Sequence, residues 1–152
     1  MMADTTSDEL EQLDDTLPPG VTREHIESRV DEWRQRLHDL FSDVIIWARA
    51  QGWRVDDSGR VPMHEQLMRQ FDMPATDQPV LRLDGEQGYA LFRPKALWVI
   101  GANGRVDLFT ARGAFTIVDL AEAGEAPRWT VYGGNKSPNG VLFSPALIET
   151  LV

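Results

Sequence analysis

The first long pattern in the chain is a run of apolar residues with the heptad spacing of an amphipathic helix. These residues are separated alternately by four and three positions, as Ile26, Val30, Trp33, Leu37, Leu40, Val44 and Trp47. Such spacing places them on one side of an α-helix. Thr22 can cap the N-terminus because its hydroxyl accepts a hydrogen bond from a free backbone N–H, and Gly52 is a typical terminator. The pattern predicts one helix over residues 22–51.

The apolar side of this predicted helix changes in width along its length. Over residues 26–40 it is narrow and flanked by charged side chains, whereas over residues 41–48 it widens with further aromatic and aliphatic residues. A helix that packs on a sheet needs a wide apolar face, and a narrow seam suits a second helix. We therefore expect the C-terminal half to lie on a sheet. The N-terminal half should meet a helix from a second copy, a partner or residues 8–17.

The length of the helix supports the same expectation. About 30 residues at ~1.5 Å each span roughly 45 Å, whereas a compact domain of this size is under ~40 Å across. Either the helix extends beyond its own domain or it breaks near Ser42 and Asp43. The candidate binding residues on this interpretation are those of the narrow seam, Ile26, Val30, Trp33 and Leu37. The alternative is that the whole helix packs on its own domain.

Short apolar runs separated by turn residues replace the helical pattern in the second half of the chain. They predict strands over residues 80–83, 89–92, 97–100, 106–109, 114–120, 129–132 and 141–143. The pair Asn103-Gly104 between two of these runs is typical of a hairpin turn. A short strand at 53–55 and a short helix at 63–71 precede the runs, and Pro145 opens a last helical turn. We therefore predict an α+β fold, with a long N-terminal amphipathic helix packed on a mainly antiparallel meander of five to seven strands.

Length and charge divide the chain into two parts. The 152 residues fit one domain, which we place at residues 21–152. Residues 1–20 carry six acidic and no basic residues, so most of the net charge of −9 belongs to a predicted acidic, mobile tail. This tail either keeps the protein in solution or acts as an acidic arm that docks on a basic partner or imitates the charge of a nucleic acid. A nearly balanced remainder argues against nucleic-acid binding, which needs a basic face.

Several classes of site and location are excluded or disfavoured by the residue types present. The chain has no cysteine, so disulfides, thiolate metal sites and cysteine nucleophiles are excluded. His25 and His38 do not share a helix face, and neither has a carboxylate at ligand spacing, so we expect no metal site and no cofactor. There is no apolar run of the ~18 residues that cross a bilayer and no secretory leader pattern. We expect a cytoplasmic protein without membrane contact.

One pair of predicted strands resembles a known catalytic hairpin. The sequence from Gly104 to Leu108, followed by the strand that ends at residues 117–121, is similar to the hairpin core of PD-(D/E)xK nucleases. The resemblance implies that Asp107 and Asp119 hold Mg²⁺, which would activate water. The chain has Ala121 where that family has its lysine. The alternative interpretation is an ordinary hairpin with a solvent-facing cross-strand pair of an arginine and an aspartate.

These observations favour a non-enzymatic function. The leading hypothesis is a protein-interaction module or adaptor subunit that acts through the 22–51 helix, by self-association or with a protein partner. One alternative is a metal-dependent enzyme or small-ligand binder that uses Arg105, Asp107 and Asp119 on the sheet. A further alternative is an acidic inhibitor or immunity-type protein that blocks a basic partner.

Overall fold

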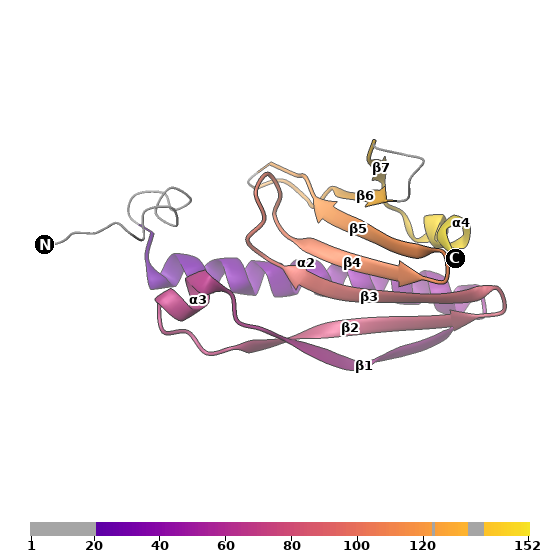
Figure 1. The fold of residues 1–152 in the computed structure, drawn as a ribbon, viewed down its shortest axis with the longest axis horizontal. Coiled ribbons are helices and arrows are strands. Elements are labelled where there is room, and N and C mark those ends of the chain that lie inside the picture. Colours follow the sequence, from indigo (N-terminus) through magenta and orange to yellow (C-terminus); the bar gives the residue numbers. More distant parts are fainter. Residues whose placement is uncertain (1–20, 123, 134–138) are drawn as a thin grey trace, which may run out of the picture.

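A seven-stranded antiparallel sheet with one long helix across it forms the described part of the protein (Figure 1). The computed structural model describes residues 21–122, 124–133 and 139–152, so the predicted acidic tail lies outside the described residues. The strands follow one another in space in their sequence order, as a meander. They are β1 (Arg54–Met63), β2 (Thr76–Gly85), β3 (Gly88–Ala96), β4 (Arg105–Thr110), β5 (Gly113–Asp119), β6 (Trp129–Gly133) and β7 (Val141–Leu142). The predicted α+β class and meander are confirmed.

The predicted long helix is present as α2 (Arg23–Ala50) and is continuous. Thr22 caps it, since its side-chain oxygen accepts a hydrogen bond from the backbone N–H of His25 at 3.3 Å. At the other end Gly52 has a φ of +82°, the left-handed conformation that ends many helices. The break considered near Ser42 and Asp43 does not occur. No helix among the described residues is both long and apolar enough to cross a membrane.

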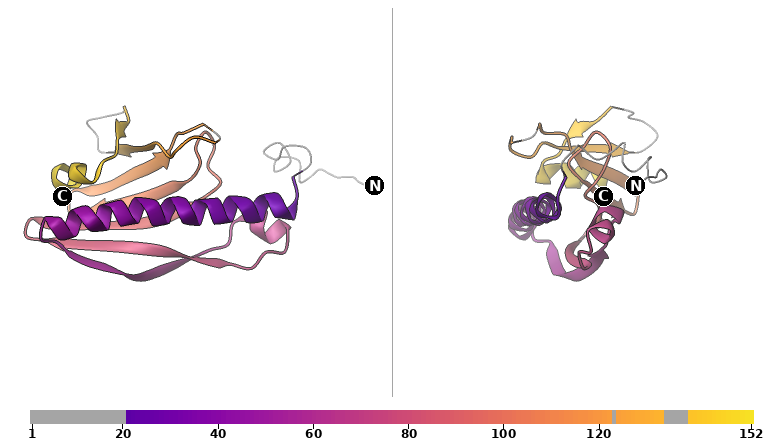
Figure 2. Two further views of the ribbon diagram at one scale, coloured as in Figure 1. Left: turned by 180° about the vertical axis from the view of Figure 1, so that it is seen from behind. Right: turned by 90° about the vertical axis from the view of Figure 1, so that its left-hand side faces the viewer.

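The expectation that the N-terminal half of α2 is left uncovered by its own domain is wrong. The side chains of Ile26, Val30, Trp33 and Leu37 are all 3% exposed or less and belong to the chain's own core. The short helix α3 (Gln66–Gln70), between β1 and β2, lies beside this half of α2 (Figure 2). The helix is covered along its length because the sheet is elongated in the direction of α2 (Figure 1), and because α3 adds buried Leu67 and Met68 to the core.

Two further sequence predictions need correction. The short strand expected at 53–55 is instead the start of the longer β1, which continues through a bulge where the pairing register with β2 shifts between Asp56 and Gly59. The strand expected at 97–100 is a loop, because β3 continues to Ala96 and ends there. The chain then needs residues 97–104 to reach β4, so Asn103-Gly104 closes a wide loop rather than a tight hairpin.

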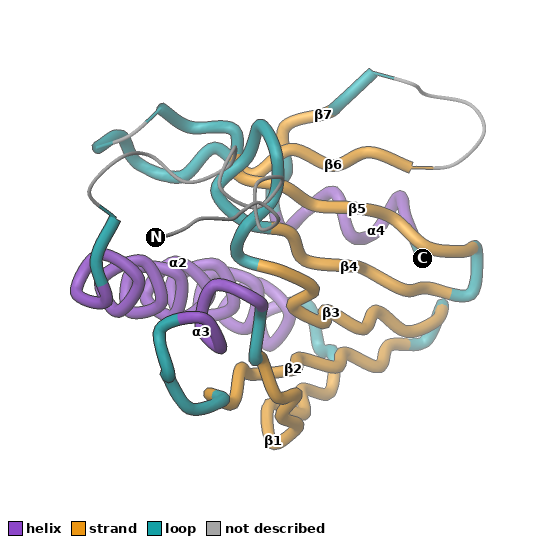
Figure 3. Tube along the Cα trace, turned by 60° about the vertical axis from the view of Figure 1, so that its left-hand side comes forward, coloured by secondary structure: helices purple, strands orange, loops and turns teal. Residues whose placement is uncertain are grey.

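The helices lie on one face of the sheet, and the opposite face carries none among the described elements (Figure 3). The chain ends with a 3₁₀ turn, η1 (Pro145–Leu147), and α4 (Ile148–Leu151), and the latter anchors the covered face through the buried Ile148. On that face alternate strand residues are fully buried. They include Leu81, Leu83, Phe92, Leu108 and Ile117. This alternation, with a period of two, decides which face each polar residue occupies.

Candidate functional site

The loop of residues 97–104, between β3 and β4, exposes an apolar side chain at its tip. Ala102 donates a backbone hydrogen bond to Val99 at 3.3 Å, which closes a four-residue turn. Gly101 occupies the third position with a φ of +79°, as a type II turn requires. Ile100, in the second position, is 96% exposed. A branched aliphatic side chain is therefore held almost wholly in solvent by a defined turn.

The N-terminal side of this loop is fixed by Glu65, which precedes α3. Its two carboxylate oxygens accept hydrogen bonds from the backbone N–H groups of Leu97, at 2.7 Å, and Trp98, at 3.3 Å. Burial raises the pKa of Glu65, although the two N–H groups act in the opposite direction. One carboxylate thus satisfies two loop amides that the end of β3 leaves without ladder partners.

The C-terminal side of the loop is fixed to β5 and to the connection that follows it. Asn103 donates its backbone N–H to the carbonyl of Asp119 at 2.8 Å, and its side-chain amide to the carbonyl of Ala121 at 2.7 Å. The N–H of Asp119 in turn donates to the carbonyl of Gly104 at 3.3 Å. The loop is therefore tied at both ends to parts of the chain that are distant in sequence.

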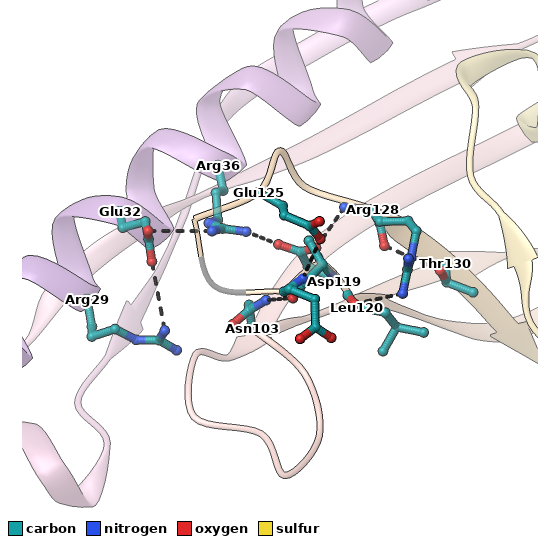
Figure 4. A network of polar contacts seen from close by, with 11 residues as sticks. Arg29, Glu32, Arg36, Asn103, Asp119, Leu120, Glu125, Arg128 and Thr130 are labelled. Atoms are coloured by element: carbon teal, nitrogen blue, oxygen red, sulfur yellow. Dashed lines mark hydrogen bonds and ion pairs between the residues drawn. The ribbon is translucent and has the colours of Figure 1, made fainter. Parts of the chain in front are cut away.

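Beneath these contacts lies a buried ion pair between α2 and β5 (Figure 4). Asp119 is fully buried, and its carboxylate accepts hydrogen bonds from the backbone of Ala121 at 3.0 Å and of Arg128 at 2.8 Å. Its other oxygen pairs with the guanidinium of Arg36, which also reaches Glu32 at 3.5 Å. A buried carboxylate is tolerated when it is paired and hydrogen-bonded in this way. The pair joins the helix to the end of the sheet that carries the loop.

Trp33 supports the same end of the loop by packing. Gly104 has a φ of +131°, and a Cβ atom there would lie within 2.8 Å of three carbons of the Trp33 ring. The ring of Trp129 also lies beside that of Trp33, with ring centroids 6.2 Å apart. Trp33, a candidate binding residue on sequence grounds, is thus part of the scaffold beneath the loop.

The remaining candidate residues from the sequence do not form one site. Arg105 and Asp107 are neighbours on the uncovered face of β4, where Arg105 Nε lies 2.8 Å from an oxygen of Asp107. Asp107 is opposite Thr116 on β5, and Asp119, three positions later, therefore points to the other face. The two acids of the nuclease-like pattern are on opposite faces of the sheet and cannot share a metal ion.

These acids belong to no metal-binding group among the described residues, and they line neither of two hollows there. The described residues contain no group of three or more histidines and carboxylates that could hold a metal. The hollows that they form beside the N-terminal half of α2 and beside β7 are lined by neither Arg105 nor Asp107.

Sequence reasoning missed Glu65 and Ile100. The partners of Glu65 are more than thirty positions away, so no local pattern could reveal its role. Ile100 was taken as the end of a strand, although the Gly101 that follows it was an available turn signal.

Comparisons of the chain with protein-family models, curated proteins and solved structures find no match.

Proposed function

We propose that this protein is a non-enzymatic interaction module that binds a partner protein through the 97–104 loop, with Ile100 as the inserted side chain. The observation that carries the proposal is the 96% exposure of Ile100 on a loop tied at both ends. An aliphatic side chain in solvent gains free energy when a partner's pocket covers it. A loop that is already ordered loses less conformational entropy on binding.

The hydrogen bonds of Glu65 and Asn103 support the proposal because they hold the 97–104 loop in one conformation. Glu65 accepts hydrogen bonds from two backbone N–H groups of the loop. Asn103 donates its backbone N–H and its side-chain amide to carbonyl groups outside the loop. Half-buried Trp98 flanks the tip and offers further apolar surface. In this arrangement α2 acts as the support of the binding surface, through Trp33 and Arg36, rather than as the surface itself.

Site-specific photo-crosslinking in cells of the source organism tests the proposal. A photoreactive amino acid is placed at position 100 and, as a matched control, at position 46, because Ile46 is also an exposed isoleucine, at 70%, but lies on α2. We expect a discrete protein adduct from position 100 and none from position 46. Ile100→Asp should remove the interaction of the purified adduct partner, and Ile46→Asp should not.

Both aspartate variants should keep the unfolding temperature of the parent protein, because neither side chain is part of the core. The absence of an adduct at position 100, or equal adducts at both positions, would show that the loop is not the binding surface.

A further inference from the structure

The two edges of the sheet are protected to very different degrees. The edge strand β1 contains a bulge, charged side chains and Pro62, which are the devices that prevent a sheet from adding further strands. Within the bulge, Asp56 accepts from the N–H of Ser58 at 2.9 Å. Arg60 donates to the carbonyls of Asp57 at 2.9 Å and Gly59 at 2.7 Å. Backbone groups of this edge are therefore already bonded to the strand's own side chains.

The opposite edge strand, β7, has none of these devices. It consists of Val141 and Leu142, which are 49% and 64% exposed and belong to the few large apolar side chains exposed in the described part of the chain. No charged residue or proline lies within it, and its pairing with β6 is regular. The unpaired backbone groups of an edge strand can pair with another strand, and β7 is guarded only by its short length.

The hydrogen-bond pattern shows which groups β7 offers. Phe143 donates its N–H to the carbonyl of Trp129 at 2.8 Å, so residues 141 and 143 direct their backbone groups toward β6. Because these directions alternate along an antiparallel strand, the N–H and C=O of Leu142 point to the open side. A polypeptide in extended conformation is the partner whose backbone complements such a donor and acceptor pair.

An apolar cavity lies beside this edge. Its volume is about 110 Å³, and it lies between the sheet and the C-terminal helical turns. The apolar side chains that line it are Phe115, Val131, Val141, Leu147 and Leu151. In strand addition the backbone supplies affinity, and a pocket for an alternate side chain supplies specificity. The cavity is of a size and lining suited to one aliphatic side chain of the added strand.

We infer that β7 accepts an extended segment of a partner polypeptide as an eighth strand, with one aliphatic side chain of that segment in the cavity. This site is separate from the 97–104 loop, which lies at the end of the sheet near the N-terminal half of α2 (Figure 1). With both surfaces in use, the protein would join two polypeptides, as an adaptor does.

A library of random twelve-residue peptides displayed on phage, selected against the full-length protein, tests this inference. We expect the enriched peptides to alternate apolar and polar residues and to bind with 1:1 stoichiometry in calorimetry. Leu142→Pro removes the outward N–H without breaking a bond to β6, so it should weaken binding at least tenfold. Leu142→Thr keeps the N–H and should change affinity less than threefold.

A second variant addresses the cavity without altering the edge backbone. Leu151→Trp fills the space, and it should also weaken binding at least tenfold while circular dichroism shows an unchanged fold. Ile100→Asp should bind the peptides normally, so failure of the loop proposal would leave this inference intact.

Three results would overturn the inference. They are a library without enriched peptides, peptides that bind Leu142→Pro as tightly as the parent, and a dimer of the free protein that Leu142→Pro abolishes. The last would identify a second copy as the occupant of the edge.

Discussion

Gly104 allows the backbone of the loop to lie directly against the ring of Trp33. Alanine at this position has two costs. A positive φ is strained for any residue with a Cβ, and the added methyl group would overlap the buried Trp33 ring, which cannot move freely. We expect Gly104→Ala to lower the free energy of unfolding by about 2–4 kcal/mol in urea titrations. Gly101→Ala is the control, because its φ is also positive but no atom lies within 4 Å of the added methyl. It should cost only about 1 kcal/mol, and equal losses would contradict the packing argument.

Glu65 gives the stability of the protein a specific dependence on pH. Its pKa is raised by burial above the ordinary value of 4.5. At a pH between the ordinary pKa and the raised pKa, Glu65 is protonated in the native state but ionised in the unfolded chain. The free energy of unfolding therefore falls as pH rises from the ordinary pKa to the raised one. Below the ordinary value both states are protonated and the penalty is absent.

The comparison of the parent protein with Glu65→Gln isolates this effect. Urea titrations between about pH 4 and pH 7 should show that the stability of the parent, relative to the variant, decreases as pH rises. A difference that increases with pH would mean that the two loop N–H groups outweigh burial at this carboxylate.

At the scale of single residues, sequence reasoning succeeded where the interaction is local. Thr22 and Gly52 were assigned to the ends of α2 because capping depends on neighbours within a turn. Asp119 was selected as a notable acid, but its partner Arg36 lies 83 positions away. Only the fold brings these two together, and the same is true of Glu65 and its loop amides.

Among the elements, α2 shows what a periodic pattern can and cannot predict. The heptad spacing correctly indicated which side of the helix is buried, since all four residues of the narrow seam are in the core. It did not indicate what buries them, because other parts of the same chain, such as the 97–104 loop and Trp129 around Trp33, cover an apolar seam as well as a partner does. The wide and the narrow parts of the apolar face both pack within the protein's own core, but against different elements.

The attachment of α2 to the sheet depends on the ion pair of Arg36 and Asp119. Removal of one partner leaves a buried charge without compensation, which typically costs about 3–5 kcal/mol. We expect Arg36→Met to lower the free energy of unfolding by about 3 kcal/mol, because Asp119 retains two backbone donors. Arg29→Met removes a neighbouring but solvent-exposed ion pair with Glu32 and should cost less than about 1 kcal/mol. Similar values for the two variants in guanidinium titrations would show that the buried pair does not hold the helix.

For the molecule as a whole, the meander and its class could be predicted, whereas the two surfaces proposed for binding could not. Turn residues between short apolar runs indicate consecutive antiparallel strands. The exposure of Ile100 and of Leu142 depends on where the sheet ends and on which elements cover it. Those are properties of the assembled fold, and the only local signal at either residue is the turn glycine, Gly101, that follows Ile100.

The free energy of local opening should decrease from the central strand β4 to the edge strand β7, because an edge strand has a neighbour on one side only. Hydrogen exchange of backbone amides can measure this gradient. Amides of β4, which has strands on both sides and α2 beneath, should exchange most slowly. Within the terminal segment, Phe143 is bonded to Trp129 and should exchange at least tenfold more slowly than Leu142, whose N–H faces outward. Addition of a selected peptide should then slow Leu142 and leave Phe143 nearly unchanged. If Leu142 is already protected as strongly as Phe143 in the free protein, the edge is covered without a partner, and strand addition at β7 is excluded.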